Sequence, residues 1–490
     1  MEVDVRMFFV RHSASATVAD WHGVGRVTVD MLPDIALLEI FDCYVNQARQ
    51  LAEEEEEYDW CNTQAWHTLV HVCRKWRALV LESPRRLDLR LLCTETTRVK
   101  DELAVWPPLP IVIGQYSLTQ MDNVVAALEH NDRVCQIDLC LVFTQSQMEE
   151  VLAAMQQPFP ALTDLTFGWD GRWLLEDETL PVVPESFLGG SAPCLQHLLL
   201  HHVSFPGLPK LLLSATSLVS LRMRNIPHSG YISPETMVRC LSTLTRLERL
   251  WLEFESPLSR PILPHPPTRS ALPALTYFRF NGVSEYLEDF VARVDAPLLD
   301  SLHIRFFHQL IFNTPQLAQF LARTPNIQPP VEALISFTDH GVEVRSPPTF
   351  PGKFVLGTSC RQLDWQLLFL SQVCSSSLPD AFISTAEHLY IHGFQLPSQN
   401  DIEDSHWVDV LQSFTAVKYL YLTQGFAPYI APTLQEPAGG VLPSLQELFL
   451  DDVYRSEHVQ KAIEKFVTTR RLAGHPIAVS VSEWDSKPYV

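Results

Sequence analysis

A pattern of apolar positions recurs along most of this chain. An apolar residue is followed by others three, five and eight positions later, as at Leu195, Leu198, Leu200 and Val203. The pattern begins again at 218, 275, 299, 386 and 445, and looser copies begin at 134, 162, 247 and 417. From 134 to 299 the copies start 23 to 33 residues apart. Self-similarity at this spacing predicts a solenoid, whose stacked units share one core.

Each copy predicts a short strand, because its central apolar residues alternate with other side chains. Helical segments lie between the strands, and Ser233-Pro234 and Thr314-Pro315 each place an N-cap residue before a proline at the first helical position. Strand followed by helix, with short connections, is typical of a parallel sheet. We therefore expect an α/β solenoid over residues 84–490, with parallel strands on its concave face and helices outside.

The copies are less clear in the second half of this region. Between 299 and 386 there is room for two further units, and we place their strands near 333–337 and 360–365, with a helix after Trp365. Residues 350–357 are predicted to form a proline-rich loop. A helix over 456–470 and a strand over 477–482 are expected to close the array.

The N-terminal part has a different pattern. Residues 1–27 show no period and are predicted to be a loosely ordered leader, and 28–83 a small helical domain with an acidic insert at 46–59. We expect that insert, with glutamate at each position from 53 to 57, to be a solvated helix extension or a loop. A helix over 63–80 is expected to bury one side: Trp66, Leu69, Val72, Cys73, Trp76 and Leu79.

The helical domain resembles an F-box, the motif that docks a protein onto the Skp-type adaptor of SCF-type cullin-RING ubiquitin ligases. The matching segments are Leu32-Pro33-Asp34-Ile35, Ile40-Phe41 and Val72-Cys73-Arg74-Lys75-Trp76-Arg77. The acidic insert makes the gap between them longer than the family's pattern. With Trp106-Pro107-Pro108-Leu109 and Leu363-Asp364-Trp365 included, the whole chain resembles fungal F-box proteins with a leucine-rich-repeat-like C-terminal domain.

The resemblance implies an adaptor-binding surface built from the matched residues: Leu32, Pro33, Ile35, Leu38, Ile40, Phe41, Val72, Cys73 and Trp76. Alternatively, the same helices are only a cap for the solenoid, whose first unit needs cover. The two interpretations differ in exposure. A cap turns its large apolar side chains towards the repeats, whereas an adaptor-binding surface leaves some of them facing outwards.

Composition narrows the possible functions. Aspartate and glutamate outnumber lysine and arginine by 57 to 36, and this net charge of −21 argues against general nucleic-acid binding and against docking on anionic lipid. The ten cysteines form no CxxC pair, and no apolar run reaches the roughly 18 residues of a membrane helix. We expect a soluble protein of the cytoplasm or nucleus.

Motifs for catalysis are missing from the sequence. It contains no Walker A, dinucleotide-binding, nucleophile-elbow or zinc-protease pattern. His67 and His71 have helical i,i+4 spacing, but no third ligand accompanies them. We therefore expect no enzyme, with no catalytic residue, metal or cofactor.

Side chains between the apolar positions of each strand should point to the concave face, because side chains alternate along a strand. We expect the target-binding residues there: Arg222, Arg224, Arg249, Trp251, Tyr277, Arg279, His303, Arg305, Tyr390 and Tyr419. Arginine and aromatic residues carry much of the energy of interfaces, and arginine binds carboxylate or phosphate through two donors. Alternatively, these residues simply fill a wide, half-exposed sheet.

The sequence thus predicts a substrate-recognition subunit of an SCF-type E3 ubiquitin ligase. The F-box would bind the Skp-type adaptor and, through it, the cullin-RING ligase, and the solenoid would bind an acidic or phosphorylated target protein. The alternative is a leucine-rich-repeat protein–protein interaction scaffold with a helical cap, not linked to ubiquitin transfer. Neither interpretation includes nucleic acid or a membrane as a partner.

Overall fold

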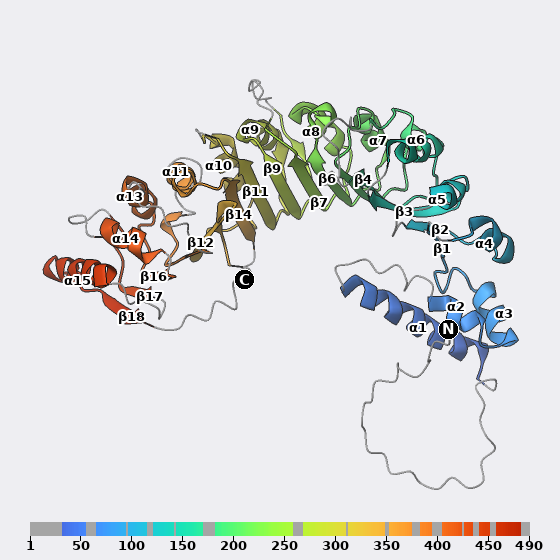
Figure 1. Cartoon of the computed structure of the whole chain (residues 1–490), viewed down its shortest axis with the longest axis horizontal. Coiled ribbons are helices and arrows are strands. Elements are labelled where there is room, and N and C mark those ends of the chain that lie inside the picture. The colour runs from blue at the N-terminus through green and yellow to red at the C-terminus, as the bar shows by residue number, and fades with distance from the viewer. Residues whose placement is uncertain are drawn as a thin grey trace, which may run out of the picture. The chain divides into compact units, whose positions relative to one another are not determined.

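The chain divides into two compact units, Met1–Arg90 and Leu91–Val490. The computed structural model, drawn in Figure 1, describes residues 32–54, 65–94, 97–114, 121–141, 144–169, 182–257, 268–309, 312–347, 352–374, 383–393, 404–423, 426–434, 441–450 and 457–481. The predicted leader at 1–27 lies outside these residues. The first unit continues past residue 83, because Leu87 and Leu89 are buried and the indole N–H of Trp66 donates to the carbonyl of Arg90 at 3.0 Å.

Three helices form the described part of the first unit: α1 (Asp34–Glu54), α2 (Ala65–Val70) and α3 (Arg74–Glu82). Helix α1 continues into the acidic insert as far as Glu54, so the start of the insert is a helix extension. The prediction of one helix over 63–80 is wrong, because the chain becomes extended at Cys73. The Cys73 thiol accepts a hydrogen bond from the backbone N–H of Trp76 at 3.5 Å and so begins α3.

The core of the first unit follows a four-residue spacing on α1. Leu37, Phe41 and Val45 are at most 3% exposed, and they lie on one side of the helix. On the same helix Ile35 and Ile40 face outwards. On the other helices Trp66, Leu69, Val70 and Val80 complete the core. The exposed Val72, predicted to be buried, lies at the break between α2 and α3.

The second unit is built on a sheet of 16 described strands. Its strands, in spatial order, are β1 (Leu91–Cys93), β2 (Ile111–Gly114), β3 (Val134–Leu141), β4 (Asp164–Trp169), β5 (His197–His201), β6 (Ser220–Ile226), β7 (Arg249–Phe254), β9 (Tyr277–Gly282), β11 (Ser301–Phe307), β14 (Lys353–Ser359), β13 (Gly341–Arg345), β12 (Glu332–Thr338), β15 (His388–Gly393), β16 (Tyr419–Leu422), β17 (Glu447–Leu450) and β18 (Ala478–Val481). A separate parallel pair joins β8 (Ser270–Ala271) and β10 (Val294–Asp295).

The described helices of the second unit lie on one face of this sheet (Figure 1). They are α4 (Val99–Val105), α5 (Met121–Leu128), α6 (Gln145–Ala154), α7 (Leu208–Ser214), α8 (Pro234–Leu241), α9 (Ser284–Ala292), α10 (Pro315–Ala322), α11 (Leu363–Gln372), α13 (Asp404–Gln412), α14 (Ala427–Leu434) and α15 (Glu457–Leu472). The opposite face, which we call the helix-free face, carries no helix in the described part of the chain. The predicted α/β solenoid is therefore present.

The recurring apolar pattern corresponds to one turn and one strand. Its first residue lies just before the strand, its second and third point into the core, and its fourth ends the strand, as in β6 and β11, or follows it by one or two residues, as in β9 and β5. In the copy that contains β5, Leu195, Leu198, Leu200 and Val203 are all at most 6% exposed. The burial of these side chains against the helices holds consecutive repeats together.

The sheet is not parallel throughout. After α10 the chain forms β12, which pairs with β15, and then returns through β13 to β14 in two antiparallel ladders. The predicted loop at 350–357 is wrong, because it contains most of β14. The strand predicted at 360–365 is also wrong: Leu363, Leu367 and Leu370 have helical spacing and are buried on α11.

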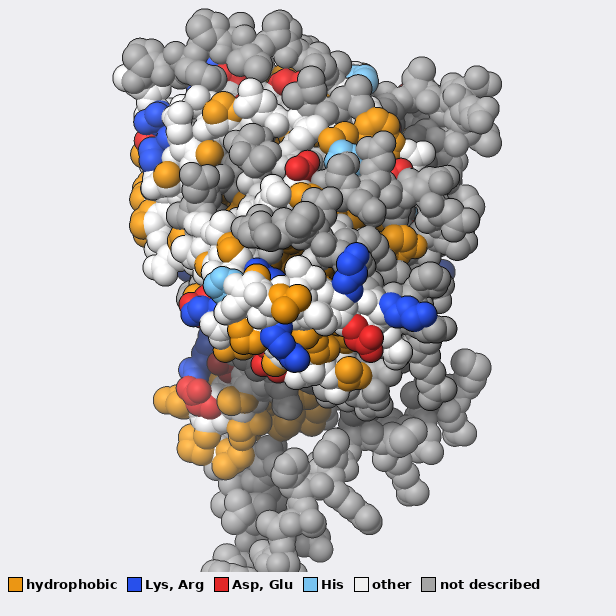
Figure 2. Space-filling model, turned by 90° about the vertical axis from the view of Figure 1, so that its left-hand side faces the viewer, with side chains coloured by type: hydrophobic (Ala, Val, Ile, Leu, Met, Phe, Trp, Pro, Cys, Tyr) orange, Lys and Arg blue, Asp and Glu red, His pale blue; other side chains and the backbone are white. Residues whose placement is uncertain are grey.

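Strand β18 ends the sheet and pairs with β17. The side chains of Val479 and Val481 are 39% and 56% exposed, and Leu472 at the end of α15 is 84% exposed. Figure 2, which views this end, shows lysine and arginine side chains beside exposed hydrophobic ones. Arg470 and Arg471 lie in the last turn of α15. No further element among the described residues covers this end of the core.

Candidate functional site

In the first unit, Lys75 joins the start of α1 to α3. Its ammonium group lies 3.2 Å from the carboxylate of Asp34 and donates to the carbonyl of Leu32 at 3.3 Å. The rings of Phe41 and Trp76 pack together with centroids 4.7 Å apart. The two halves of the F-box-like motif therefore meet in space, although the acidic insert separates them in the sequence.

The predicted adaptor-binding residues divide into a buried and an exposed group. The buried or partly buried members are Phe41, Leu32, Leu38, Cys73 and Trp76. The exposed members are Pro33, Ile35 at 70%, Ile40 at 50% and Val72 at 56%. Tyr44, which the sequence analysis did not select, is 42% exposed one turn after Ile40. The first unit thus leaves several large apolar side chains facing outwards.

The helix-free face of the second unit carries the predicted target-binding residues. Arg222, Trp251, Arg279 and His303 are in register across β6, β7, β9 and β11. A parallel row contains Arg249, Tyr277, Ser301 and Lys353 on β7, β9, β11 and β14. Apolar residues between these rows, such as Leu250, Phe278 and Leu302, are at most 1% exposed. The alternation along the strands therefore places the arginines and aromatic residues on the same face.

Trp251 lies between two guanidinium groups. The guanidinium carbon of Arg279 is 4.2 Å from its ring centroid, and that of Arg224 is 4.8 Å away. The indole N–H donates to the carboxylate of Glu253 at 3.0 Å, and Glu253 also lies 3.8 Å from Arg224. These cation–π contacts, together with the hydrogen bond to Glu253, fix the orientation of the indole.

Not every arginine on this face is available to a ligand. Arg305 forms an ion pair with Glu343, which β13 supplies from the antiparallel part of the sheet. Arg224 is partly neutralised by Glu253. Sequence reasoning missed both carboxylate partnerships. The pairing of Arg305 depends on β13, which was not predicted.

A hollow of about 670 Å³ opens on the helix-free face. Its lining residues are Arg222, Arg249, Trp251, Thr276, Tyr277, Asp300, Ser301, His303, Gly352 and Lys353. Burial and the neighbouring Arg279 lower the pKa of His303 below its usual value, which favours the neutral imidazole. Lys353 was missed, because the sequence analysis assigned it to a loop. The sequence did contain a sign of this strand. Apolar Phe354 and Leu356, which are buried, alternate with Lys353 and Val355.

Aromatic rings form a ladder on the same face at β15, β16 and β17. Tyr390 and Tyr421 stack with centroids 4.3 Å apart, and Tyr421 stacks on Phe449 at 4.4 Å. In the next row His388 stacks on Tyr419 at 4.6 Å. Tyr390 and Tyr419 thus lie on the predicted face, but several strands away from the arginines. Tyr390 is only 7% exposed, so little of this predicted target-binding side chain faces solvent.

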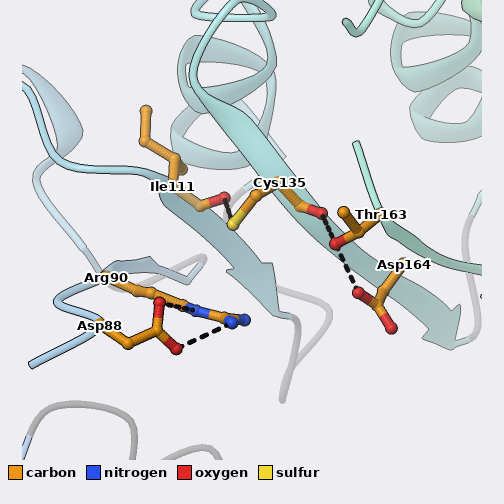
Figure 3. A network of polar contacts seen from close by, with 6 residues as sticks. All are labelled: Asp88, Arg90, Ile111, Cys135, Thr163 and Asp164. Carbon is orange, nitrogen blue, oxygen red and sulfur yellow. Dashed lines mark hydrogen bonds and ion pairs between the residues drawn. The ribbon is translucent and has the colours of Figure 1, made fainter. Parts of the chain in front are cut away.

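The first strands of the sheet carry a different set of polar groups (Figure 3). The Cys135 thiol donates to the carbonyl of Ile111 at 3.3 Å. The Thr163 hydroxyl lies 3.0 Å from the carbonyl of Cys135 and 2.6 Å from the carboxylate of Asp164. Close by on β3, burial raises the pKa of Asp138 to about 6. The bonds from Cys135 and Thr163 to backbone carbonyls join successive repeats.

Within the described ranges, no group of three or more histidine, cysteine, aspartate or glutamate side chains is placed to hold a metal ion. Nor is any described helix long and apolar enough to cross a membrane. The predicted metal-free character of the protein and its expected compartment stay predictions.

This chain matches no protein-family model and no curated protein. Among solved structures, it is similar to the leucine-rich repeat-containing protein LegL7 from Legionella pneumophila, with 11% identity and a TM-score of 0.24. The match covers 77% of this chain and 97% of that one. Because a TM-score this low reflects little shared geometry, the fold assignment rests on the strand order and helix placement described above.

Proposed function

We propose that this protein is a substrate-recognition subunit of an SCF-type E3 ubiquitin ligase, with the first unit docking on a Skp-type adaptor. The observation that carries the proposal is the outward exposure of Ile35, Ile40 and Val72 on the segments that resemble an F-box. Exposed apolar side chains of this size favour contact with a partner over contact with water. The joining of the two motif halves through Lys75 and the Phe41–Trp76 ring pair supports the same function.

The helix-free face of the solenoid would then select the target protein. Its arginines stand out in a chain whose net charge is −21. A cationic region on an acidic protein favours an anionic partner segment, because complementary potentials steer association and exclude partners of like charge. Trp251 and the tyrosines of the ladder would add apolar contact area.

The proposed mechanism is proximity. The chain itself would make or break no covalent bond. Holding a target beside the ligase raises the target's effective concentration at the site of ubiquitin transfer. The ordered solenoid would carry the target, and the first unit would carry the attachment to the ligase.

Binding of the full-length protein to a purified Skp-type adaptor, measured by titration calorimetry, tests the proposal. The variant Ile40→Asp/Val72→Asp places charges on the exposed surface, and we expect it to weaken binding by about a hundredfold or more. Leu298→Asp is the matched control, because Leu298 is a 52% exposed apolar residue of the second unit. Absence of binding by the wild-type protein would leave an interaction scaffold unlinked to ubiquitin transfer as the better description.

A further inference from the structure

Three cations of the helix-free face differ from the others. Arg222, Arg249 and Lys353 line the hollow, and none forms an ion pair with a carboxylate of the described residues. By contrast, Arg224 and Arg305 each lie beside a glutamate. Arg279 forms no ion pair among the described residues either, but its guanidinium group lies over the Trp251 ring, so three of the unpaired cations of this face meet at the hollow.

The hollow exists because a small residue stands between larger ones. In the row Arg249, Tyr277, Ser301, Lys353, the serine on β11 contributes only a hydroxyl group. Arg249 and Lys353 are separated by three strand spacings, which is about 14 Å between Cα atoms. Both have long side chains that reach towards the space above Ser301. Gly352, just before Lys353, also lines the hollow.

The walls of the hollow favour a compact anion over a flat ring. Trp251 already makes cation–π contacts with Arg224 and Arg279. Tyr277 packs against His303, with ring centroids 5.4 Å apart. The indole ring is therefore already engaged by two guanidinium groups, and the cations without a carboxylate partner are what the hollow offers to a ligand.

We propose that this hollow binds a phosphate group carried by a serine or threonine of the target protein. A phosphate monoester brings close to two negative charges and three acceptor oxygens, which suits three cationic donors and the Ser301 hydroxyl. A single carboxylate has one charge and two oxygens, so it would leave some of these cations and the Ser301 hydroxyl without a partner. The proposal rests on the proposed function, because it assumes that the helix-free face holds the target.

Asp300 is the one carboxylate among the residues that line the hollow. It is exposed to solvent, where water and salt screen its repulsion of a bound anion. The three cations outnumber it. Its position at the rim disfavours segments with further acidic residues on that side.

The test uses the full-length protein and short degenerate peptide libraries that differ only at one fixed central residue: phosphoserine, serine or glutamate. Binding is measured by fluorescence polarisation. We expect the phosphoserine library to bind about tenfold or more tightly than the other two, and inorganic phosphate to compete with it. The variant Arg249→Gln/Lys353→Gln should lose this preference.

The matched control is Lys210→Gln/Arg239→Gln, which removes the same charge from exposed residues of α7 and α8, outside the helix-free face. We expect it to bind the phosphoserine library within about threefold of the wild type. Equal loss in both variants would show general attraction and overturn the proposal. Equal binding of the glutamate and phosphoserine libraries would also overturn it, while leaving an acidic target in place. If no library binds but the adaptor does, the phosphate site is rejected and the adaptor part of the proposed function stands.

Discussion

The carboxylate of Glu288 accepts a hydrogen bond from the backbone N–H of Leu317 at 2.8 Å and so joins α9 to the N-terminus of α10. Its other oxygen accepts from the N–H of Gln316, also at 2.8 Å. Thr314 occupies the N-cap position, as predicted, but its buried hydroxyl has no hydrogen-bond partner in the described part of the chain. The N-terminus of α10 is therefore capped by a side chain of the preceding repeat and not by its own N-cap residue.

Replacement of Glu288 by alanine should destabilise the second unit. The change removes two charge-assisted hydrogen bonds and leaves two N–H groups at a helix start without partners. We expect the free energy of unfolding to fall by about 2–3 kcal/mol, measured by urea denaturation. Glu235→Ala, an exposed acidic residue in the first turn of α8, is the control and should cost less than about 1 kcal/mol.

The stability of the wild-type protein should also depend on pH through Glu288. Burial raises the pKa of this carboxyl from 4.5 to about 7, and the two backbone hydrogen bonds only partly oppose that rise. Between these values the folded protein holds a proton that the unfolded chain has lost, so its stability falls as pH rises from about 4.5 to about 7. We therefore expect the melting temperature of the wild-type protein to fall relative to that of Glu288→Gln as pH rises across this window. Thermal melting of both proteins at several pH values measures this. A difference in melting temperature between the two proteins that does not change with pH would contradict the raised pKa of Glu288.

Much of the fold follows from the alternation of apolar residues. The strands at β5, β6, β9 and β11 each contain residues that alternate between core and solvent, and this pattern can be read without knowing the partner strands. The antiparallel return through β13 and β14 could not be predicted in this way. Gly341–Arg345 is short, a proline-containing segment follows it, and its position depends on pairing with residues far along the chain.

The candidate site was predictable to a similar extent. Alternation alone places Arg222, Arg249 and Arg279 on one face. It does not show that Arg305 is paired with Glu343 or that Lys353 joins the hollow, because both depend on the pairing of β13 and β14. Which apolar residues of α1 are exposed could not be predicted for a different reason. Leu37, Leu38 and Ile40 are all apolar, and only packing against α2 and α3 decides which of them is buried.

Gly341→Ala should open the antiparallel part of the sheet. A Cβ atom at this position would lie well inside contact distance of the backbone carbonyl oxygen of Thr358 on β14, and backbone cannot move aside as a side chain can. We expect a loss of about 1–3 kcal/mol and faster amide hydrogen exchange over 341–345 and 353–359. Exchange over Ser220–Ile226 should be unchanged and serves as the control within the same molecule. Equal protection of 341–345 in both proteins would contradict the observed pairing of β13.

Ile40 and Phe41 are neighbours on α1 with opposite surroundings, since their side chains are 50% and 0% exposed. Phe41→Ala removes a ring from the core and should cost about 3–5 kcal/mol, because the cavity cannot close fully. Ile40→Ala should change stability by less than about 1 kcal/mol, since alanine is also the better helix former. Amide hydrogen exchange of α2, which packs against α1, measures the change in stability of each variant in the full-length protein. A large loss for Ile40→Ala would mean that this side chain is already packed within the chain, and it would remove the apolar surface on which adaptor docking is proposed.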